Sequence, residues 1–313
     1  MATRHAPIVT LTVNPALDVS TSTEQVTPEH KLRCGPSRLD PGGGGVNVSR
    51  VVGRLGGHAP AVVALGGPTG EAYRRLLDAD SVTARVVSIA GSTRENFTVD
   101  ETSSGEQFRF VLQGPQLTED EWQSCLDATA ASLVGGGWVV PSGSLPPGVP
   151  DDFYARLARL AHDAGARCVV DASGEALVEA LREGVYLVKP SGRELGEIVG
   201  ATLSTFDEKV AAARELVGRH AVEVVVLSLG ADGAALVTKH DTVRLASPPI
   251  TVRSTVGAGD SMVAAIVLRL AEGRSLADAF RAGVAAGAAT ASTPATELCD
   301  PNEVARLEAL LTR

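Results

Sequence analysis

Residues 138–170, WVVPSGSLPPGVPDDFYARLARLAHDAGARCVV, contain two short apolar runs on either side of a helical stretch. Trp138-Val-Val140 and Cys168-Val-Val170 are typical of buried strands, and the pattern over residues 151–164 predicts a helix. The alternation continues with helical patterns over residues 176–182, 193–199 and 207–219 and apolar runs over residues 186–188 and 222–227. Such units predict an α/β fold, in which a mostly parallel sheet carries helices on both faces.

Capping sequences mark the starts of several helices. Thr118-Glu-Asp-Glu121 and Thr205-Phe-Asp-Glu208 have the spacing of capping boxes. Asp300-Pro301 places a capping residue before a proline at the first helical position. Helices are therefore expected to begin just after these residues. The remaining helices are predicted over residues 48–55, 261–271, 276–290 and 302–311.

The first third of the chain is less regular and predicts a small sheet. Residues 19–38 are polar, and residues 96–100 face residues 106–112 across Thr102-Ser-Ser-Gly105, which is typical of a β-hairpin. These strands carry too few apolar side chains for the core, so we expect them to stand off the main body as a lid over a ligand. We expect one domain over residues 1–313, with the lid formed by about residues 15–40 and 94–113.

Charge and cysteine distribution argue against several classes of protein. The net charge is −9, and no basic run suggests nucleic acid or an anionic membrane as the main partner. No apolar run approaches the length of a membrane span or of a signal sequence. The scattered cysteines predict buried free thiols and no disulfide or zinc site, so we expect a cytoplasmic protein that binds small molecules. These cysteines are Cys34, Cys125, Cys168 and Cys299.

Val256-Gly-Ala-Gly-Asp-Ser261 combines a glycine-rich turn with an acid at a helix start. The free amides and the positive end of the helix dipole at such a position suit an anion. On this stretch alone, two interpretations of Asp260 are equally good. It is a helix cap, or it is a general base that accepts a hydroxyl proton while the amides of Gly257, Ala258 and Gly259 stabilise a transferred phosphoryl group.

A second glycine cluster, Pro41-Gly-Gly-Gly-Gly-Val-Asn47, lets a ligand approach the backbone of Gly43 and Gly44. The Asn47 amide can bind hydroxyl groups, although a glycine run can also be a flexible linker. Asp18 follows a short strand expected in the middle of the sheet, where a carboxylate can bind sugar hydroxyls or stabilise a turn.

Arg94 and Ser144 are candidates for a phosphate group. Arg94 stands at the start of the hairpin, where it is either a solvated surface residue or a bidentate phosphate ligand. Ser144 lies in Pro141-Ser-Gly-Ser-Leu-Pro-Pro147, which is as well explained by a plain loop as by a ligand contact.

Two further strand ends, Lys189-Pro-Ser-Gly-Arg-Glu194 and Ser228-Leu-Gly-Ala-Asp-Gly233, have the composition of a nucleotide site. Either could be an ordinary strand-to-helix loop, where glycine and serine are common. All of these candidates fall at strand carboxyl ends or in the lid, and this common location favours one shared site.

Together these residues resemble the ribokinase-like (pfkB-type) carbohydrate kinases over essentially the whole chain. Thr255-Val-Gly-Ala-Gly-Asp-Ser261 resembles the C-terminal signature of that family, and the glycine cluster with Asn47 resembles the N-terminal one. Other strings are similar to the branch that acts on fructose 6-phosphate, namely Lys31-Leu-Arg-Cys34, Ser103-Ser-Gly-Glu-Gln107 and Ser142-Gly-Ser-Leu-Pro-Pro-Gly148. The resemblance implies a three-layer α/β/α sandwich with a small β-sheet lid. It also implies Mg²⁺-dependent transfer of the ATP γ-phosphoryl group to the 1-hydroxyl of fructose 6-phosphate, giving fructose 1,6-bisphosphate.

The resemblance also implies a role for each matching residue. Asp260 would be the base, and Gly257, Ala258 and Gly259 the anion hole. The sugar hydroxyls would be held by Asp18, Gly43, Gly44 and Asn47, and the 6-phosphate by Arg94, Asn96 and Ser144. The nucleotide side would be lined by Lys189, Ser191, Ser228, Gly230 and Gly233.

Metals and assembly are implied by the same resemblance. Glu194 matches an acid that organises Mg²⁺ indirectly, but this chain has Ser191 where the family usually has asparagine, which is expected to alter metal affinity. A K⁺ site is implied at Ser254, Val256 and residues 290–297, in a segment that differs from similar enzymes. Similar enzymes form homodimers through their lid sheets, and Lys31 matches a lysine that contacts nucleotide across the dimer.

Other functions fit parts of the sequence. A nicotinamide-dependent dehydrogenase is disfavoured because Gly257-Ala-Gly-Asp-Ser-Met262 lacks the third glycine of the dinucleotide motif and lies near the C-terminus. A non-catalytic sugar or nucleotide sensor is an alternative because folds are reused, although binding alone needs no base at Asp260. Among kinases, 1-phosphofructokinase and tagatose-6-phosphate kinase are the alternatives. Those enzymes more often carry a lysine where this chain has Gly44, which favours fructose 6-phosphate.

Overall fold

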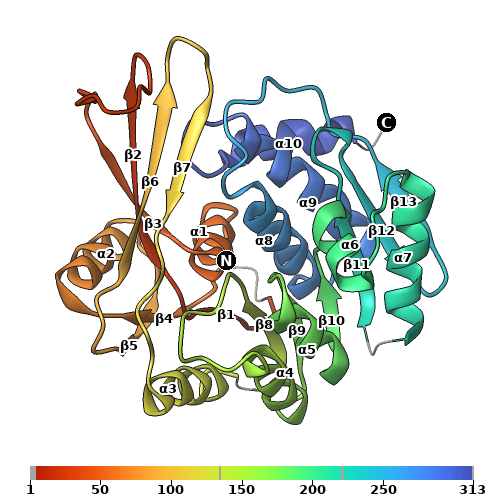
Figure 1. Ribbon diagram of the computed structural model, residues 1–313. Helices are drawn as coiled ribbons and strands as arrows, with labels where there is room; N and C mark the ends of the chain where they lie inside the picture. Colours follow the sequence, from red (N-terminus) through yellow and green to blue (C-terminus); the bar gives the residue numbers. More distant parts are fainter. Residues whose placement is uncertain (1–4, 134, 220–221, 312–313) are drawn as a thin grey trace.

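A nine-stranded sheet forms the centre of the computed structural model, which describes residues 5–133, 135–219 and 222–311 (Figure 1). In spatial order the strands are β13 (Thr242–Leu245), β12 (Ala234–Thr238), β11 (Val222–Ser228), β10 (Val185–Val188), β9 (Ala166–Val170), β8 (Gly137–Pro141), β1 (Ile8–Thr12), β4 (Ala61–Leu65) and β5 (Ala84–Ser88). Every pairing from β11 to β5 is parallel, and β12 and β13 continue the sheet antiparallel. The carboxyl ends of the parallel strands therefore meet at one edge of the sheet.

Helices cover both faces because successive side chains of a strand point to opposite sides. On β1, Val9 and Leu11 pack into one helical layer, and Ile8 packs into the other. The first layer contains α3 (Glu119–Ala130), α4 (Phe153–Asp163), α5 (Glu175–Glu183), α6 (Gly192–Val199) and α7 (Phe206–Arg219). The second contains α1 (Gly44–Arg54), α8 (Ala258–Ala271), α9 (Leu276–Ala291) and α10 (Pro301–Leu310), with α2 (Gly67–Ala79) packed beside α1. The predicted three-layer fold is confirmed.

The predicted helix caps form. Thr118 closes a capping box at the start of α3, and Thr205 exchanges the same pair of bonds with Glu208 before α7. The Asp300 carboxylate accepts hydrogen bonds from two amides at the start of α10.

Two helices begin three or four residues earlier than predicted, α1 at Gly44 and α8 at Ala258. Glycine has low helix propensity, so these first turns were not recognised in the sequence. They are stabilised by contacts from outside the helix. The hydroxyl of Thr12, at the end of β1, accepts a 2.9 Å hydrogen bond from the Val46 amide in the first turn of α1.

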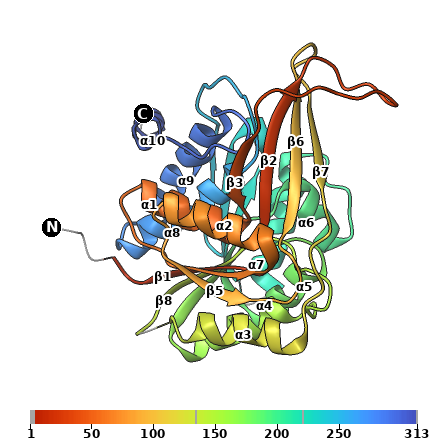
Figure 2. The same ribbon diagram turned by 90° about the vertical axis from the view of Figure 1, so that its left-hand side faces the viewer.

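A four-stranded sheet stands beside this layered body (Figures 1 and 2). Its order is β3 (Arg38–Gly42), β2 (Ala16–Thr23), β6 (Arg94–Glu101) and β7 (Gln107–Val111). The pair of β6 and β7 is the predicted hairpin. Asp18 lies within β2 and not in a turn behind β1, because the chain enters the small sheet already at Ala16.

The cysteines differ from expectation at one position. Cys125, Cys168 and Cys299 are buried free thiols as predicted, but Cys34 is exposed. It lies in the polar segment between β2 and β3, which packs against no core. Among the helices of the described residues, none is long and apolar enough to cross a bilayer.

Candidate active site

Two helix N-termini meet at the carboxyl edge of the large sheet. Asn47, in the first turn of α1, donates a 2.9 Å hydrogen bond from Nδ2 to Oδ2 of Asp260, in the first turn of α8. Gly257 caps α8 with φ of 74°, and a Cβ there would lie 2.8 Å from the Leu298 side chain, so only glycine fits. The Ala258 amide makes a long hydrogen bond of 3.4 Å with the Thr255 carbonyl. The N-terminus of α8 thus combines a carboxylate with amides that suit an anion.

The surroundings of Asp260 hold its carboxyl at the pKa that a base needs near neutrality. Protein atoms enclose the group although part of its surface stays accessible, and this burial raises its pKa to about 7. The charge of Asp171 raises the pKa further, whereas the hydrogen bond from Asn47 and the charge of Lys189 lower it. A carboxyl with this pKa can accept a proton and release it again at physiological pH.

Asp171 is a site residue that the sequence reasoning missed. Its Oδ1 lies 3.2 Å from Nζ of Lys189, which is only 8% exposed. Burial lowers the pKa of Lys189, but the charges of Asp171 and Asp260 raise it, and the resulting pKa is above the ordinary value for lysine. The sequence did carry a signal, because Asp171 directly follows the apolar run of β9, at a strand carboxyl end like the chosen candidates.

The small sheet supplies a second carboxylate. Oδ1 of Asp18 accepts a 3.0 Å hydrogen bond from Nδ2 of Asn96, on the neighbouring strand β6. Burial raises the pKa of Asp18 to about 6, although the Asn96 hydrogen bond lowers it. A Cβ at Gly42 would lie 2.0 Å from Oδ2 of Asp18, so the absence of a side chain in β3 makes room for this carboxylate.

The glycine cluster brings backbone close to the site. A Cβ at Gly44 would lie 2.0 Å from the Ser142 hydroxyl, and Gly43 has φ of 128°. Gly43 caps α1, and Gly44 is its first helical residue. The cluster is therefore a helix N-terminus, not the flexible linker that was the alternative.

Arg94, on β6, lines a cavity of about 540 Å³ together with Asn14. Its two terminal nitrogens donate to backbone carbonyls of Leu112 and Asn14, but its buried Nε has no partner. Nδ2 of Asn14 donates to the Ser144 hydroxyl at 3.1 Å, and its buried Oδ1 is also unpartnered. Since buried polar atoms usually find partners, these two atoms mark the wall of the cavity as a candidate site for a polar ligand. Asn14 was not selected from the sequence.

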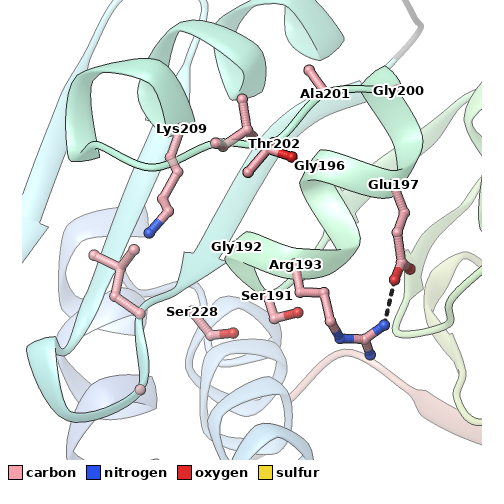
Figure 3. A pocket seen from close by; sticks show the side chains of 13 residues that line it. Ser191, Gly192, Arg193, Gly196, Glu197, Gly200, Ala201, Thr202, Lys209 and Ser228 are labelled. Carbon is pink, nitrogen blue, oxygen red and sulfur yellow. Dashed lines mark hydrogen bonds and ion pairs between the residues drawn. The ribbon is translucent and has the colours of Figure 1, made fainter.

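A cavity of about 790 Å³ opens between the start of α6 and the end of β11 (Figure 3). Ser191, Ser228 and Gly230 line it, together with Lys209, which was not predicted. Ser191 caps α6 in a capping box with Glu194, whose Oε2 accepts a 2.8 Å bond from the Ser191 amide. The predicted nucleotide loops thus border one open cavity.

Three predicted nucleotide residues lie outside that cavity lining. Lys189 is held against Asp171 instead, and its Nζ would lie 3.0 Å from a Cβ at Gly259. A Cβ at Gly233 would lie 2.1 Å from the Leu245 carbonyl oxygen. The close packing of this turn therefore explains why the residue is glycine. Lys31 is exposed on the segment between β2 and β3.

The predicted potassium segment lies close to the end of α9. The amides of Arg253 and Ser254 donate to the Ala291 carbonyl at 2.8 and 3.3 Å, and the Ser254 hydroxyl accepts a 3.3 Å bond from the Val256 amide. In the loop after α9, the Thr293 hydroxyl lies within hydrogen-bond distance of the Thr290 carbonyl, in the last turn of α9, and of the Glu297 carbonyl. The described residues contain no group of three or more His, Cys, Asp or Glu that could hold a metal.

Comparisons with known proteins agree with this arrangement. Residues 7–303 match the model of the pfkB family carbohydrate kinases. The chain is 49% identical over 299 residues to the ATP-dependent 6-phosphofructokinase isozyme 2 of Mycobacterium tuberculosis, covering 96% of this chain and 88% of that protein. A crystal structure of the phosphofructokinase-2 from Escherichia coli in complex with fructose-6-phosphate superposes with a TM-score of 0.93 at 42% identity, covering 98% and 100% of the two chains. A structure of the same protein in complex with potassium gives 0.94 at 43% identity over the same shares.

Proposed function

The chain belongs to the pfkB family of carbohydrate kinases, and we propose that it transfers the γ-phosphoryl group of ATP to the 1-hydroxyl group of fructose 6-phosphate. The observation that carries this proposal is the Asp260 carboxyl at the N-terminus of α8, with a pKa of about 7. The sugar hydroxyl oxygen attacks the γ-phosphorus, the bond from that phosphorus to the ADP oxygen breaks, and Asp260 accepts the hydroxyl proton. The products are ADP and fructose 1,6-bisphosphate.

The helix N-terminus stabilises the phosphoryl group during transfer. The amides of Gly257, Ala258 and Gly259 face the charge that develops on it, and the dipole of the 14-residue helix α8 adds to their effect. Lys189 adds a buried positive charge beside them. Catalysis of phosphoryl transfer is mostly positioning and charge stabilisation, which these groups supply without further chemistry.

The sugar phosphate spans the two sheets in this proposal. Asp18 and Asn47 bind its hydroxyls together with the backbone at Gly43 and Gly44, and Asn96 orients Asp18. Arg94 lines the cavity beside Asn14 and binds the 6-phosphate with its guanidinium, supported by Ser144 through Asn14. A guanidinium in the wall of a cavity suits a phosphorylated sugar better than an unphosphorylated one.

ATP occupies the cavity at the start of α6, between Ser191, Ser228 and Gly230. Mg²⁺ fits this side because it binds through phosphates, water and one or two carboxylates, and needs no protein cage. Glu194 would receive a water of the magnesium shell on the oxygen that does not bind the Ser191 amide. When bound, Mg²⁺ neutralises phosphate charge. K⁺ would be held by the carbonyls of Ser254 and Val256, and a relative's structure contains potassium.

Residues 1–313 form one kinase domain in this proposal, with a lid of about residues 15–40 and 94–113. The free buried thiols Cys125, Cys168 and Cys299 suit a reducing compartment, so we place the reaction in the cytoplasm.

The assay that tests the function measures ADP release by the purified protein with Mg²⁺-ATP. We expect turnover with fructose 6-phosphate at a kcat/KM above that with fructose 1-phosphate, tagatose 6-phosphate or fructose. A higher kcat/KM for another phosphosugar would move the assignment to that sugar. Ligand-induced stabilisation without ADP release would instead establish the sensor function.

We further propose that two chains dimerise through their lid sheets. Leu39, Val19, Phe97 and Phe110 are register partners across the four strands, so their side chains form one row on one face. Asp18 directly precedes Val19, and Asn96 directly precedes Phe97. The side chains of Asp18 and Asn96 therefore point to the opposite face of the small sheet, toward the site. Phe110 is 51% exposed and Leu39 44%, which leaves an apolar row in need of a partner. Lys31 would then reach the nucleotide of the second chain.

Phe110→Asp is expected to convert the dimer to a monomer. A desolvated aromatic residue at the centre of an interface contributes about 2 kcal/mol or more, so the dissociation constant should rise roughly 30-fold or more. Sedimentation equilibrium measures this shift. The matched control is Val243→Asp on β13, an exposed apolar residue of the large sheet, which should leave the mass unchanged. Equal masses for wild type and Phe110→Asp would contradict the lid interface.

A further inference from the structure

The hydrogen bond between Asn47 and Asp260 depends on which end of the Asn47 amide faces the carboxyl. With Nδ2 toward Asp260, the amide donates and favours the ionised carboxylate, which is the form that acts as a base. With Oδ1 toward Asp260, the amide could only accept, and would favour the protonated carboxyl. Something in the structure must hold the amide in the first orientation.

Arg50 lies three residues after Asn47 on α1 and is 5% exposed. Its Nη1 lies 3.4 Å from Oδ1 of Asn47 and 3.5 Å from the Pro41 carbonyl oxygen. A guanidinium has only donors and stays charged, so the amide end that faces Arg50 has to be the oxygen. Nδ2 of Asn47 is thereby left for Asp260.

Two carboxylates hold Arg50 in this position. Its Nε lies 2.6 Å from Oδ2 of Asp80, and its Nη2 lies 3.5 Å from Oδ1 of Asp40, which is 4% exposed. Asp40 lies in β3 of the small sheet and also accepts bonds from Arg38 and Thr296. The guanidinium is therefore fixed from outside α1, as a positioning group has to be.

We infer that Arg50 is a positioning residue that fixes the Asn47 amide as a hydrogen-bond donor to Asp260. This inference rests on the proposed function, because it matters only where Asp260 works as a base. Arg50 touches none of the proposed ligands and acts through Asn47 alone.

Other charged groups around these two side chains remain in place when Arg50 is changed. Those that act on Asp260 are Asp171, Lys189 and Asp18. Those that face Arg50 are Asp40 and Asp80, and the charge of Arg50 in turn acts on the buried phenol of Tyr73. A shift in the pKa of Asp260 after replacement of Arg50 can therefore come from the Asn47 amide or from the altered surroundings of Arg50. A variant that alters these surroundings but leaves Asn47 in place separates the two causes.

The variant that tests the inference is Arg50→Gln, because glutamine can present either a donor or an acceptor to Asn47 and so releases its orientation. We expect the acid limb of kcat/KM against pH, which reports the free enzyme, to move up by about one pH unit, the size of one lost hydrogen bond. At pH 6 kcat/KM should fall roughly 10-fold, and above pH 9 it should approach the wild-type value. Arg50→Lys keeps a group that only donates and should keep the wild-type limb.

Asp80→Asn is the matched control, because it removes a charge next to Arg50 while the asparagine oxygen can still accept the Nε bond and Asp40 still holds Nη2, so that Arg50 keeps its place beside Asn47. It should lower the unfolding temperature and leave the acid limb where it is. The substrate-free protein supplies a second readout, the titration of the ¹³C-labelled Asp260 carboxyl, assigned by its loss in Asp260→Asn. That titration should shift upward in Arg50→Gln in step with the acid limb.

An Asp260 titration in Arg50→Gln equal to that of the wild type would overturn the inference, as would an equal shift in Asp80→Asn. Absence of turnover in the wild type would instead defeat the proposed function. The two failures are distinguishable, because the carboxyl titration needs no substrate.

Discussion

Asp260→Asn is expected to lower kcat with fructose 6-phosphate by about 10²-fold or more, while KM for the sugar and for ATP stays within about threefold. Asparagine keeps the size of the side chain and can still meet the Asn47 amide through its oxygen. It cannot accept the hydroxyl proton, and loss of a positioned general base typically removes about 10²–10⁴ in rate. Steady-state ADP release at pH 8 measures both constants.

The stability of this variant gives an internal control. The folded pKa of Asp260, about 7, lies above the ordinary value of 3.8, so the folded protein binds more protons than the unfolded chain between these values. Stability contributed by the protonated carboxyl is therefore present below pH 4 and is lost as the pH rises toward 7. Asparagine has no charge to bury, so Asp260→Asn should unfold at a higher temperature than the wild type at pH 8. A variant with raised stability and lost turnover cannot owe its inactivity to misfolding.

Near-normal turnover in Asp260→Asn would remove Asp260 from the base role and return it to the helix-cap interpretation. The pH profile of the wild type bears on the same point. The rate should fall as the pH drops through about 7, because the protonated carboxyl cannot accept a proton.

The layered fold could be predicted because local patterns and burial agree in this chain. Strands such as β10 are continuous apolar runs, since both faces of a parallel sheet are covered, and helices such as α3 carry their own capping boxes. The starts of α1 and α8 could not be predicted, because glycine disfavours helix and the stabilising contacts come from distant segments. The bond from Val46 to Thr12 spans 34 positions of sequence.

The site could be predicted only as a set of strand ends. Local patterns predicted Asp260, Asn47 and Arg94 as site residues, but no pattern indicated that Asn47 would contact a residue 213 positions away. Asp171 has the same position directly after a strand as the predicted site residues, but its ion pair with Lys189 becomes visible only in the structure. Arg50 has the appearance of an ordinary helix residue in the sequence, since its burial between two carboxylates arises only from the packing of α1 against β3 and the end of α2.

Arg94→Ala is expected to lower kcat/KM for fructose 6-phosphate by roughly 10–150-fold, mainly through KM. The guanidinium of Arg94 is half-buried, and this burial lowers its pKa. The lowered pKa indicates that nearby negative charge does not fully compensate the positive charge of Arg94. A phosphate group in the cavity that Arg94 lines would supply the missing negative charge. Hydrogen bonds to charged groups contribute about 1.5–3 kcal/mol, which corresponds to the stated range. Initial rates over a fructose 6-phosphate series at saturating ATP measure the effect.

Two comparisons separate a phosphate contact from a general loss of lid structure. Any slow turnover of unphosphorylated fructose should be the same in Arg94→Ala and the wild type, because fructose carries no group for Arg94 to bind. Arg85→Ala is the matched control, since Arg85 also lies on a strand and donates to a carbonyl, that of Ala128 at 3.2 Å, but on β5 of the large sheet. It should leave kcat/KM unchanged. Equal losses in the two variants, or an equal loss with fructose, would show that Arg94 supports β6 and its carbonyl partners and does not bind the phosphate.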